Sequence, residues 1–412
     1  MPNKPITIEF LNVSTPQGHG GMLSHAEGSY VFQYGATAGA AVEISLTMPR
    51  RVLPYISDNE KLFPIFEMNL PEGYVLEQLR SRFAKASNFD PMLLLAITGQ
   101  EAAIGRVAVE TPLMPATGSD AGISLDTILK WKGAEDLFAS LAQRYLLRTG
   151  LSGVQPKLLV PEAIDAEPIR GKGTLATRDL IVKAGDAQFP ALAINEFICM
   201  SIARKAGIPV PEFHLSENRK LFVVRRFDRM DDERVLGFED MTVLMGRSAA
   251  DKYKGSYRQI ANALRLFLAP EHVAQGLAQL FDQVALSVMV GNGDAHLKNF
   301  GILYSDPTAN DARMAPAYDI VNTTRYIPED GLALSLGGSR NLFTAHIDIL
   351  DFAQECNVAE PIQRLQEILS AAESVLAAQS DLLLDEPELR AAITHGLERV
   401  ASGLDRLPAP PS

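Results

Sequence analysis

An aspartate and an asparagine stand five positions apart in a short polar segment of the chain, residues 290–300. They are Asp294 and Asn299, and a second aspartate, Asp319, follows twenty positions later within apolar sequence. Phosphoryl transfer from ATP needs a carboxylate near the acceptor hydroxyl and oxygen ligands for Mg²⁺. The spacing therefore predicts that Asp294 orients or deprotonates an acceptor, and that Asn299 and Asp319 bind the metal.

The same polar segment has a plainer interpretation as a loop, because Asp and Asn are frequent turn formers. The second aspartate favours chemistry, since a carboxylate framed by apolar residues usually needs a metal or a cation nearby. Gly291 and Gly293 would let the chain turn tightly after the apolar stretch before them. His296 lies two positions after Asp294 and could either tune a metal centre or serve only the fold.

Two further segments could meet the phosphates of a nucleotide. Lys183 ends a predicted strand over residues 179–183, where it either reaches phosphate or is simply solvated. Glu196, on the helix predicted next, either pairs with Lys183 or faces water. Residues 150–157 lack the spacing of a Walker A loop, but their glycines could present backbone N–H groups to phosphate. The alternative for this segment is a hairpin with a solvated Lys157.

The elements that must position these groups form a strand-containing half followed by a helical half. Strands are predicted over residues 6–13, 29–34, 179–183, 213–215 and 221–224, with a glycine-rich turn at residues 18–21. Helices are predicted over residues 76–83, 91–98, 194–206, 257–267, 274–290, 361–384 and 387–404. Residues 111–122 are a plausible linker, and residues 408–412 should be disordered. This order predicts an α+β fold with two unequal lobes and a ligand-binding cleft.

Composition excludes several classes of protein. The 412 residues carry a formal charge of −12, which argues against unaided binding to nucleic acid. No apolar run approaches the ~20 residues that span a bilayer, and residues 1–6 do not resemble a secretory signal. Cys199 and Cys356 are too few for a disulfide framework and are predicted to be buried thiols. We therefore expect a cytoplasmic protein with no membrane contact.

Taken together, these segments resemble the HipA family of toxin–antitoxin kinases. Ten motifs in the family's order carry the resemblance: residues 42–49, 63–73, 152–157, 180–183, 195–197, 206–211, 225–229, 239–241, 293–300 and 316–320. The resemblance covers residues 5–405. It implies a bilobal, protein-kinase-like fold with a mixed N-terminal lobe, an extra N-terminal subdomain and a mostly helical C-terminal lobe. The expected boundaries are 1–110 for the subdomain, 111–226 for the nucleotide-binding lobe and 227–412 for the catalytic lobe.

The resemblance also implies roles for individual residues in a serine/threonine protein kinase that uses ATP and Mg²⁺. Asp294 matches the catalytic aspartate, and Asn299 and Asp319 match the magnesium ligands. The remaining matches concern the nucleotide. They are Lys183 for its phosphates, Arg225 and Phe227 in the hinge that meets adenine, His296 beside the catalytic aspartate, and Ser152, Gly153, Val154, Gln155 and Lys157 in the phosphate-binding loop.

In the family this loop can carry an autophosphorylated serine and flip outward to stop activity. Family loops commonly have a serine two positions before Ser152, where this chain has Gly150. Ser152 is therefore the remaining candidate for autophosphorylation. Phosphate there would add about −1.5 to −2 charges and repel the phosphates of ATP.

The family further implies a HipB-like helix-turn-helix antitoxin as partner, DNA contact only through that antitoxin, and an aminoacyl-tRNA synthetase as the class of protein substrate. Two other functions stay open at this point. A small-molecule kinase of the aminoglycoside-phosphotransferase type uses the same Asp and Asn spacing but would lack the first ~110 residues. A catalytically silent corepressor of a DNA-binding partner would have no need of the three oxygen-bearing residues.

Overall fold

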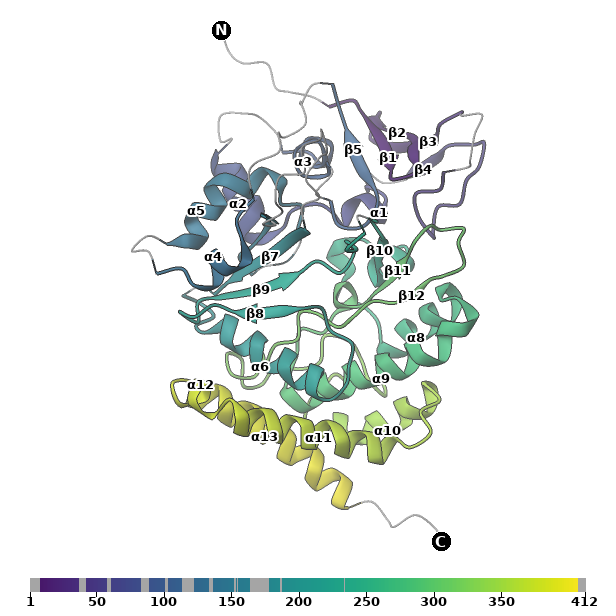
Figure 1. The fold of residues 1–412 in the computed structure, drawn as a ribbon. Coiled ribbons are helices and arrows are strands. Elements are labelled where there is room, and N and C mark those ends of the chain that lie inside the picture. The colour runs from purple at the N-terminus through teal and green to yellow at the C-terminus, as the bar shows by residue number, and fades with distance from the viewer. Residues whose placement is uncertain are drawn as a thin grey trace. The chain divides into compact units, whose positions relative to one another are not determined.

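The computed structural model describes residues 8–36, 42–57, 61–82, 89–100, 103–112, 122–132, 136–151, 153, 155–163, 178–185, 187–232 and 234–406. The chain divides into two compact units (Figure 1). The first consists of Met1–Asp186, Phe213–Ala249 and Leu303–Asp311, and the second of Ala187–Glu212, Ala250–Ile302 and Ala312–Ser412. The chain thus passes from one unit to the other several times. The expected boundaries at residues 110 and 226 stay predictions.

An antiparallel sheet of five strands forms the N-terminal part of the first unit. Its order is β4-β3-β2-β1-β5, with β1 at Phe10–Thr15, β2 at Gly18–Ala26, β3 at Ser29–Tyr34, β4 at Tyr55–Ser57 and β5 at Ala108–Glu110. The glycine-rich segment 18–21 was predicted to separate two strands; Gly18, with φ of 124°, does follow the β1–β2 turn, but Gly20 and Gly21 lie inside β2. A Cβ at Gly20 would lie 2.9 Å from Cγ2 of Ile44, and one at Gly21 would collide with the carbonyl of Gln33. Glycine is needed there for close packing rather than for a turn.

The first unit also contains short helices: α1 at Pro64–Glu67, α2 at Gly73–Arg82, α3 at Pro91–Thr98, α4 at Leu125–Leu129, α5 at Leu137–Tyr145 and the 3₁₀ turn η1 at Leu146–Arg148. Helix α3 begins and ends at the predicted residues. Asp90 accepts a hydrogen bond from the backbone N–H of Leu93 and caps the helix, and Pro91 occupies the first turn, where no N–H is needed. Every residue of α3 after Pro91 is buried.

A second antiparallel sheet of the first unit has the order β6-β7-β9-β8. Its strands are β6 at Lys157–Glu162, β7 at Arg178–Ala184, β8 at Phe213–Leu215 and β9 at Leu221–Arg225. The predicted hairpin between β8 and β9 is confirmed, since Phe213 pairs with Val224 and Leu215 with Phe222. This unit also contains β10 at Gly237–Asp240 and α7 at Met241–Leu244, whose first turn is capped by the side chain of Asp240.

The second unit is helical. Its helices are α6 at Leu192–Lys205, α8 at Tyr257–Phe267, α9 at Val273–Val290, α10 at Ala345–Glu355, α11 at Pro361–Ala378, α12 at Ser380–Leu384 and α13 at Pro387–Asp405, with 3₁₀ turns η2 at Ala249–Asp251, η3 at Pro270–His272 and η4 at Leu297–Asn299. Strand β11, Gly301–Tyr304, crosses the division between the units, and β12 is Arg313–Met314. Helix α8 matches its predicted bounds, but the predicted helix 361–384 is interrupted at Gln379, where ψ is 23°.

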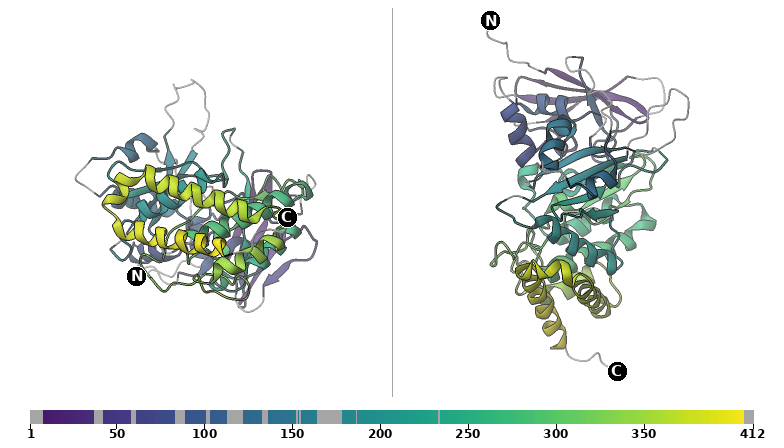
Figure 2. Two further views of the ribbon diagram at one scale, coloured as in Figure 1. Left: turned by 90° about the horizontal axis from the view of Figure 1, so that it is seen from below. Right: turned by 60° about the vertical axis from the view of Figure 1, so that its left-hand side comes forward.

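Helix α9 forms the centre of the second unit. Helices α8, α10, α11 and α13 all pack against it, and α11 also packs on α6 and α13, so that α11 and α13 run side by side (Figure 2). The segment 270–290 is apolar and long enough to cross a membrane, but 72% of it is buried in the protein. That degree of burial is what a core helix shows.

Candidate active site

The polar loop that carries Asp294 begins where α9 ends. Gly291 caps the helix in the left-handed conformation, with φ of 70°, and a Cβ there would lie 2.6 Å from Oγ1 of Thr324. A Cβ at Gly293 would collide with the carboxylate of Asp330 and lie 2.6 Å from the carbonyl oxygen of Gly331. Gly291 therefore makes the tight turn that its position predicted, whereas Gly293 is required because its neighbours leave no room for a side chain.

Asp294 is half-buried, and its position is fixed by hydrogen bonds on three sides. Its backbone N–H donates to Oδ1 of Asn292 at 3.0 Å, and its carbonyl accepts from the N–H of His296 at 2.8 Å. Its Oδ1 accepts a hydrogen bond from the hydroxyl of Tyr253 at 2.7 Å. Tyr253 lies 41 positions earlier in the chain, and no local pattern in the sequence pointed to it.

The two predicted metal ligands lie next to each other in the same unit. Nδ2 of Asn299 is 3.5 Å from Oδ2 of Asp319, and Oδ1 of Asn299 accepts from the backbone N–H of His296 at 3.0 Å. Asp319 has a φ of 57°, in the left-handed region that side chains rarely adopt. Backbone strain of this kind clusters at functional sites.

The donor set around Asn299 and Asp319 fits Mg²⁺ better than a transition metal. Among the described residues, no group of three or more His, Cys, Asp or Glu side chains could hold a metal ion. Mg²⁺ is commonly bound by one or two carboxylates together with substrate phosphates and water. One carboxylate and one amide oxygen therefore suffice when a nucleotide supplies the remaining ligands.

His296, which lies between Asp294 and Asn299 in the sequence, is a buried, neutral imidazole. Burial, with the nearby positive charge of Lys252, lowers the pKa of His296 to about 3. The edge of its ring faces Tyr253, with 5.1 Å between the ring centroids. His296 therefore contributes shape and polarity beside Asp294 and adds no positive charge.

Two fully buried asparagines form hydrogen bonds that join the segments around the site. Neither was predicted as a site residue. The side chain of Asn195, on α6, exchanges two hydrogen bonds of 2.8 Å with the backbone of Asn322. The side chain of Asn322 donates to the carbonyl of Val290 at 2.6 Å and accepts from the N–H of Arg325 at 2.8 Å. Asn322 thus ties α6, the end of α9 and the segment after Asp319 together.

In the first unit, two of the predicted phosphate-binding lysines lie directly opposite each other. Lys157 on β6 pairs in register with Lys183 on β7, and the two are 7% and 5% exposed. The interpretation of either lysine as a solvated strand-end residue is therefore wrong. Directly opposed side chains have Cβ atoms about 4.5–5.5 Å apart, so both lysines project from the same face of the sheet. This face of the sheet therefore carries two lysines that could meet the phosphates of one nucleotide.

Gly153, in the segment before Lys157, has a backbone conformation that favours glycine. Gly153 has a φ of 114°, and a Cβ on it would lie 2.7 Å from Nζ of Lys157. The side chain of Gln155 donates to the carbonyl of Ala184 at 3.5 Å. Ser152 and Val154 lie outside the described residues. Gly150 is closely packed, because a Cβ there would lie 2.9 and 3.0 Å from two backbone carbonyl oxygens, so this position disfavours the serine common in the family.

The predicted hinge residues lie at the end of β9, with Arg225 as its last residue and Phe227 two positions beyond. Arg225 forms an ion pair with Glu162, and the Phe227 ring contacts Phe238 edge-on at 5.6 Å. Between them, the buried Arg226 bridges Asp179 at 3.1 Å and Asp228 at 2.6 Å. These charged contacts anchor the end of β9 within its sheet.

Glu196 and the two cysteines can also be placed. Glu196 is 1% exposed on α6, so the alternative in which it faces water is wrong, and its pairing with Lys183 stays a prediction. Cys199 and Cys356 are buried free thiols, as predicted, and burial raises the pKa of each to about 12.

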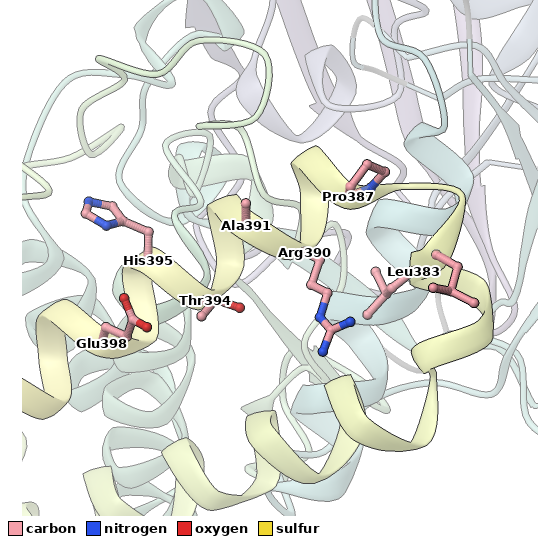
Figure 3. Close-up of a pocket in the computed structure, with 8 residues that line it drawn as sticks. Leu383, Pro387, Arg390, Ala391, Thr394, His395 and Glu398 are labelled. Carbon is pink, nitrogen blue, oxygen red and sulfur yellow. The ribbon is translucent and has the colours of Figure 1, made fainter.

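A groove on the surface of the helical unit runs along α12 and α13, lined in part by Leu383, Arg390 and Glu398 (Figure 3). None of the predicted site residues lines it. The groove is therefore separate from the residues that suggest phosphoryl transfer.

Comparison with known proteins places the chain among similar sequences over most of its length. Residues 11–110 match the family model "HipA N-terminal domain" and residues 149–379 match "HipA-like C-terminal domain". Two relatives from Sinorhizobium fredii have names that class them as candidate kinases. Y4dM is 30% identical over 300 residues, covering 68% of this chain and 67% of its own length. Y4mE is 28% identical over 390 residues, covering 87% and 88%.

A solved structure shares the fold. A chain of the Shewanella oneidensis MR-1 complex of HipA, HipB and operator DNA superposes with a TM-score of 0.64 and 20% sequence identity, covering 96% of this chain and 97% of that one. This likeness confirms the predicted α+β, kinase-like fold.

Proposed function

The chain belongs to the HipA family, and on that premise we propose that it is a serine/threonine protein kinase that uses Mg²⁺ and ATP and acts as the toxin of a toxin–antitoxin pair. The single observation that carries the proposal is the arrangement in the helical unit. There Nδ2 of Asn299 lies 3.5 Å from Oδ2 of Asp319, and the loop that bears Asn299 also carries the half-buried carboxylate of Asp294. These are the groups that phosphoryl transfer requires from a protein.

In the proposed reaction Asp294 orients the acceptor hydroxyl and takes its proton on a carboxylate oxygen as the hydroxyl oxygen bonds to the γ-phosphorus of ATP. The bond from that phosphorus to the bridging oxygen breaks, and ADP leaves. Asn299 and Asp319 would hold Mg²⁺, which neutralises negative charge on the phosphates when bound. The hydrogen bonds around Asp294 fix its position before substrate arrives, so little reorganisation is needed during the transfer.

The opposed lysines of the first unit support nucleotide binding. Lys157 and Lys183 would neutralise the phosphates, and the turn at Gly153 would bring backbone N–H groups close to them. The backbone of Arg225 and Phe227 would meet the adenine ring. Their register on β6 and β7 supports this assignment, because it places both lysines on the same face of one sheet.

The partner and the protein substrate belong to the same proposal. The Shewanella structure contains HipB and operator DNA together with HipA. By analogy, we assign to this chain a HipB-like helix-turn-helix antitoxin, with DNA contact only through that partner. The proposed substrate class is an aminoacyl-tRNA synthetase, as the family resemblance implies. Ser152 is the proposed autophosphorylation site of the phosphate-binding loop.

The match of residues 11–110 to the HipA N-terminal domain counts against an aminoglycoside-phosphotransferase type of enzyme. A silent corepressor is disfavoured by the proximity of Asn299 and Asp319, since a protein without catalysis would have no need of that pair beside Asp294.

The decisive experiment incubates the purified chain with γ-labelled ATP, Mg²⁺ and a lysate of its host, followed by identification of the labelled protein and residue. Asp294→Ala should lower labelling at least a hundredfold, because positioned general-base catalysis contributes ~10²–10⁴ in rate. Nucleotide affinity should survive this change. Asp381→Ala, an exposed aspartate of α12, serves as the matched control and should label normally. Near-normal labelling by the Asp294→Ala protein would refute the catalytic assignment.

A further inference from the structure

Tyr253 touches the proposed catalytic carboxylate although it lies on a different segment of the helical unit. Its hydroxyl donates to Oδ1 of Asp294 at 2.7 Å, within the range of a strong hydrogen bond to an ionised acceptor. Tyr253 as a whole is 41% exposed. A tyrosine that served only the core would be expected to bury its ring, as Tyr257 does four positions later.

The backbone on both sides of Tyr253 forms hydrogen bonds with other segments of the same unit. The carbonyl of Lys252 accepts a hydrogen bond from the N–H of Leu297 at 3.1 Å, which joins this segment to the turn that bears Asn299. The carbonyl of Tyr253 accepts from the guanidinium of Arg340. The carbonyl of Gly255 accepts from the N–H of Ser335 at 3.1 Å. Backbone hydrogen bonds therefore hold the segment from which the phenol of Tyr253 projects.

A carboxylate that acts as a general base needs one oxygen aimed at the acceptor, and rotation of the side chain about its terminal bond works against this. A donor that holds the other oxygen removes that freedom. Catalytic groups are effective when neighbouring hydrogen bonds lock their rotamers in this way. In this site Tyr253 holds Oδ1 of Asp294, which fixes the plane of the carboxylate that would receive the acceptor hydroxyl.

We infer that Tyr253 is a positioning residue of the phosphoryl-transfer site, acting through Asp294 by fixing the orientation of its carboxylate. The inference rests on the proposed function, because it takes Asp294 to be the group that receives the acceptor. It predicts a specific kinetic signature. Loss of the phenol hydroxyl should reduce turnover, whereas the Michaelis constant for ATP should not change, since Tyr253 is assigned no contact with the nucleotide.

The test compares Tyr253→Phe with the unchanged protein in labelling of host-lysate acceptors at varied Mg-ATP. We expect the maximal rate to fall roughly tenfold, the value of one hydrogen bond to a charged group, with the Michaelis constant for ATP within twofold. The thermal unfolding midpoint should be unchanged, because the ring stays in place. Tyr55→Phe removes an exposed hydroxyl that donates to the carbonyl of Pro49 in the other unit, and it should leave the rate unaltered.

The outcomes separate the two proposals. An unchanged or increased maximal rate in Tyr253→Phe, with Asp294→Ala inactive, overturns the positioning role and leaves the kinase assignment standing. A faster Tyr253→Phe protein would indicate that the phenol blocks the acceptor. If Asp294→Ala labels normally, or if the unchanged chain labels nothing, the proposed function fails and the inference falls with it. A loss in Tyr253→Phe that appears wholly in the Michaelis constant for ATP also contradicts it.

Discussion

Glu239 should make the first unit less stable as pH rises from 4.5 to 7. Its hydrogen bonds alone would suggest the opposite, because they favour the ionised carboxylate. The side chain is fully buried on β10. It accepts hydrogen bonds from the hydroxyl of Tyr304, from the backbone N–H of Leu46 at 2.8 Å and from Oγ of Ser45 at 3.0 Å. Burial outweighs these bonds and raises the pKa of Glu239 from an ordinary value of 4.5 to about 7.

The sign of the effect follows from proton binding. Between pH 4.5 and 7 the folded protein holds a proton on Glu239 that the unfolded chain has released, so the free energy of unfolding falls as pH rises through this window. The difference of about 2.5 between the two pKa values corresponds to about 3 kcal/mol once the window has been crossed. Glu239→Gln keeps the shape of the protonated acid, and its amide can donate to Oγ of Ser45. The variant should match the unchanged protein at pH 4.5 and exceed its stability by up to about 3 kcal/mol at pH 8.

The assay is urea unfolding followed by tryptophan fluorescence at pH 4.5, 6 and 8. Trp131 is the single tryptophan of the chain and lies in the first unit, so its emission reports on that unit. Subtracting the two proteins at each pH cancels the titration of every other group. Glu110→Gln, an exposed glutamate on β5, is the matched control and should show no pH-dependent difference. If Glu239→Gln is less stable than the unchanged protein at pH 8, the buried carboxylate is ionised and favourable, and the reasoning is wrong.

Two further predictions concern the helical unit. Asp319→Ala should abolish the Mg²⁺-dependent part of the affinity for a non-hydrolysable ATP analogue, because only the amide of Asn299 would be left at the metal position. Calorimetric titration with and without Mg²⁺ measures this affinity. Equal affinities in the variant and the unchanged protein would contradict the metal assignment. Asn322→Ala should cost about 2–5 kcal/mol, since it leaves the buried carbonyl of Val290 and the N–H of Arg325 without their partner. Urea unfolding followed by circular dichroism measures that cost, and a loss below about 1 kcal/mol would show that the segment relaxes around the gap.

The parts of this structure that sequence reasoning predicted well are those set by local pattern. Helix α8 has its bounds fixed by a capping box between Ser256 and Gln259 and by apolar residues at helical spacing. The loop after α9 was predicted from two glycines and the spacing of Asp294 and Asn299. In each case the physical cause lies within a few residues of the feature, so a single sequence is enough to read it.

The parts that were missed depend on contacts between distant residues. The glycines of β2 suggested a turn because a sequence does not show that Ile44 and the carbonyl of Gln33 crowd against them. Lys157 and Lys183 were each judged alone, and only the register of β6 and β7 reveals that they oppose each other. Tyr253 has no motif of its own that marks it.

The distribution of the missed residues has a physical meaning for the proposed kinase. Local pattern located the groups that would touch ATP, metal and acceptor, whereas the residues that hold those groups still, Tyr253, Asn195 and Asn322, come from other segments. A reactive side chain on a loop is oriented by hydrogen bonds from another, separately packed segment, because the loop's own residues do not fix its conformation. Positioning residues should therefore be sought among long-range hydrogen bonds to the loop ends. In this chain those bonds converge on Asn322 for the backbone and on Tyr253 for the carboxylate of Asp294.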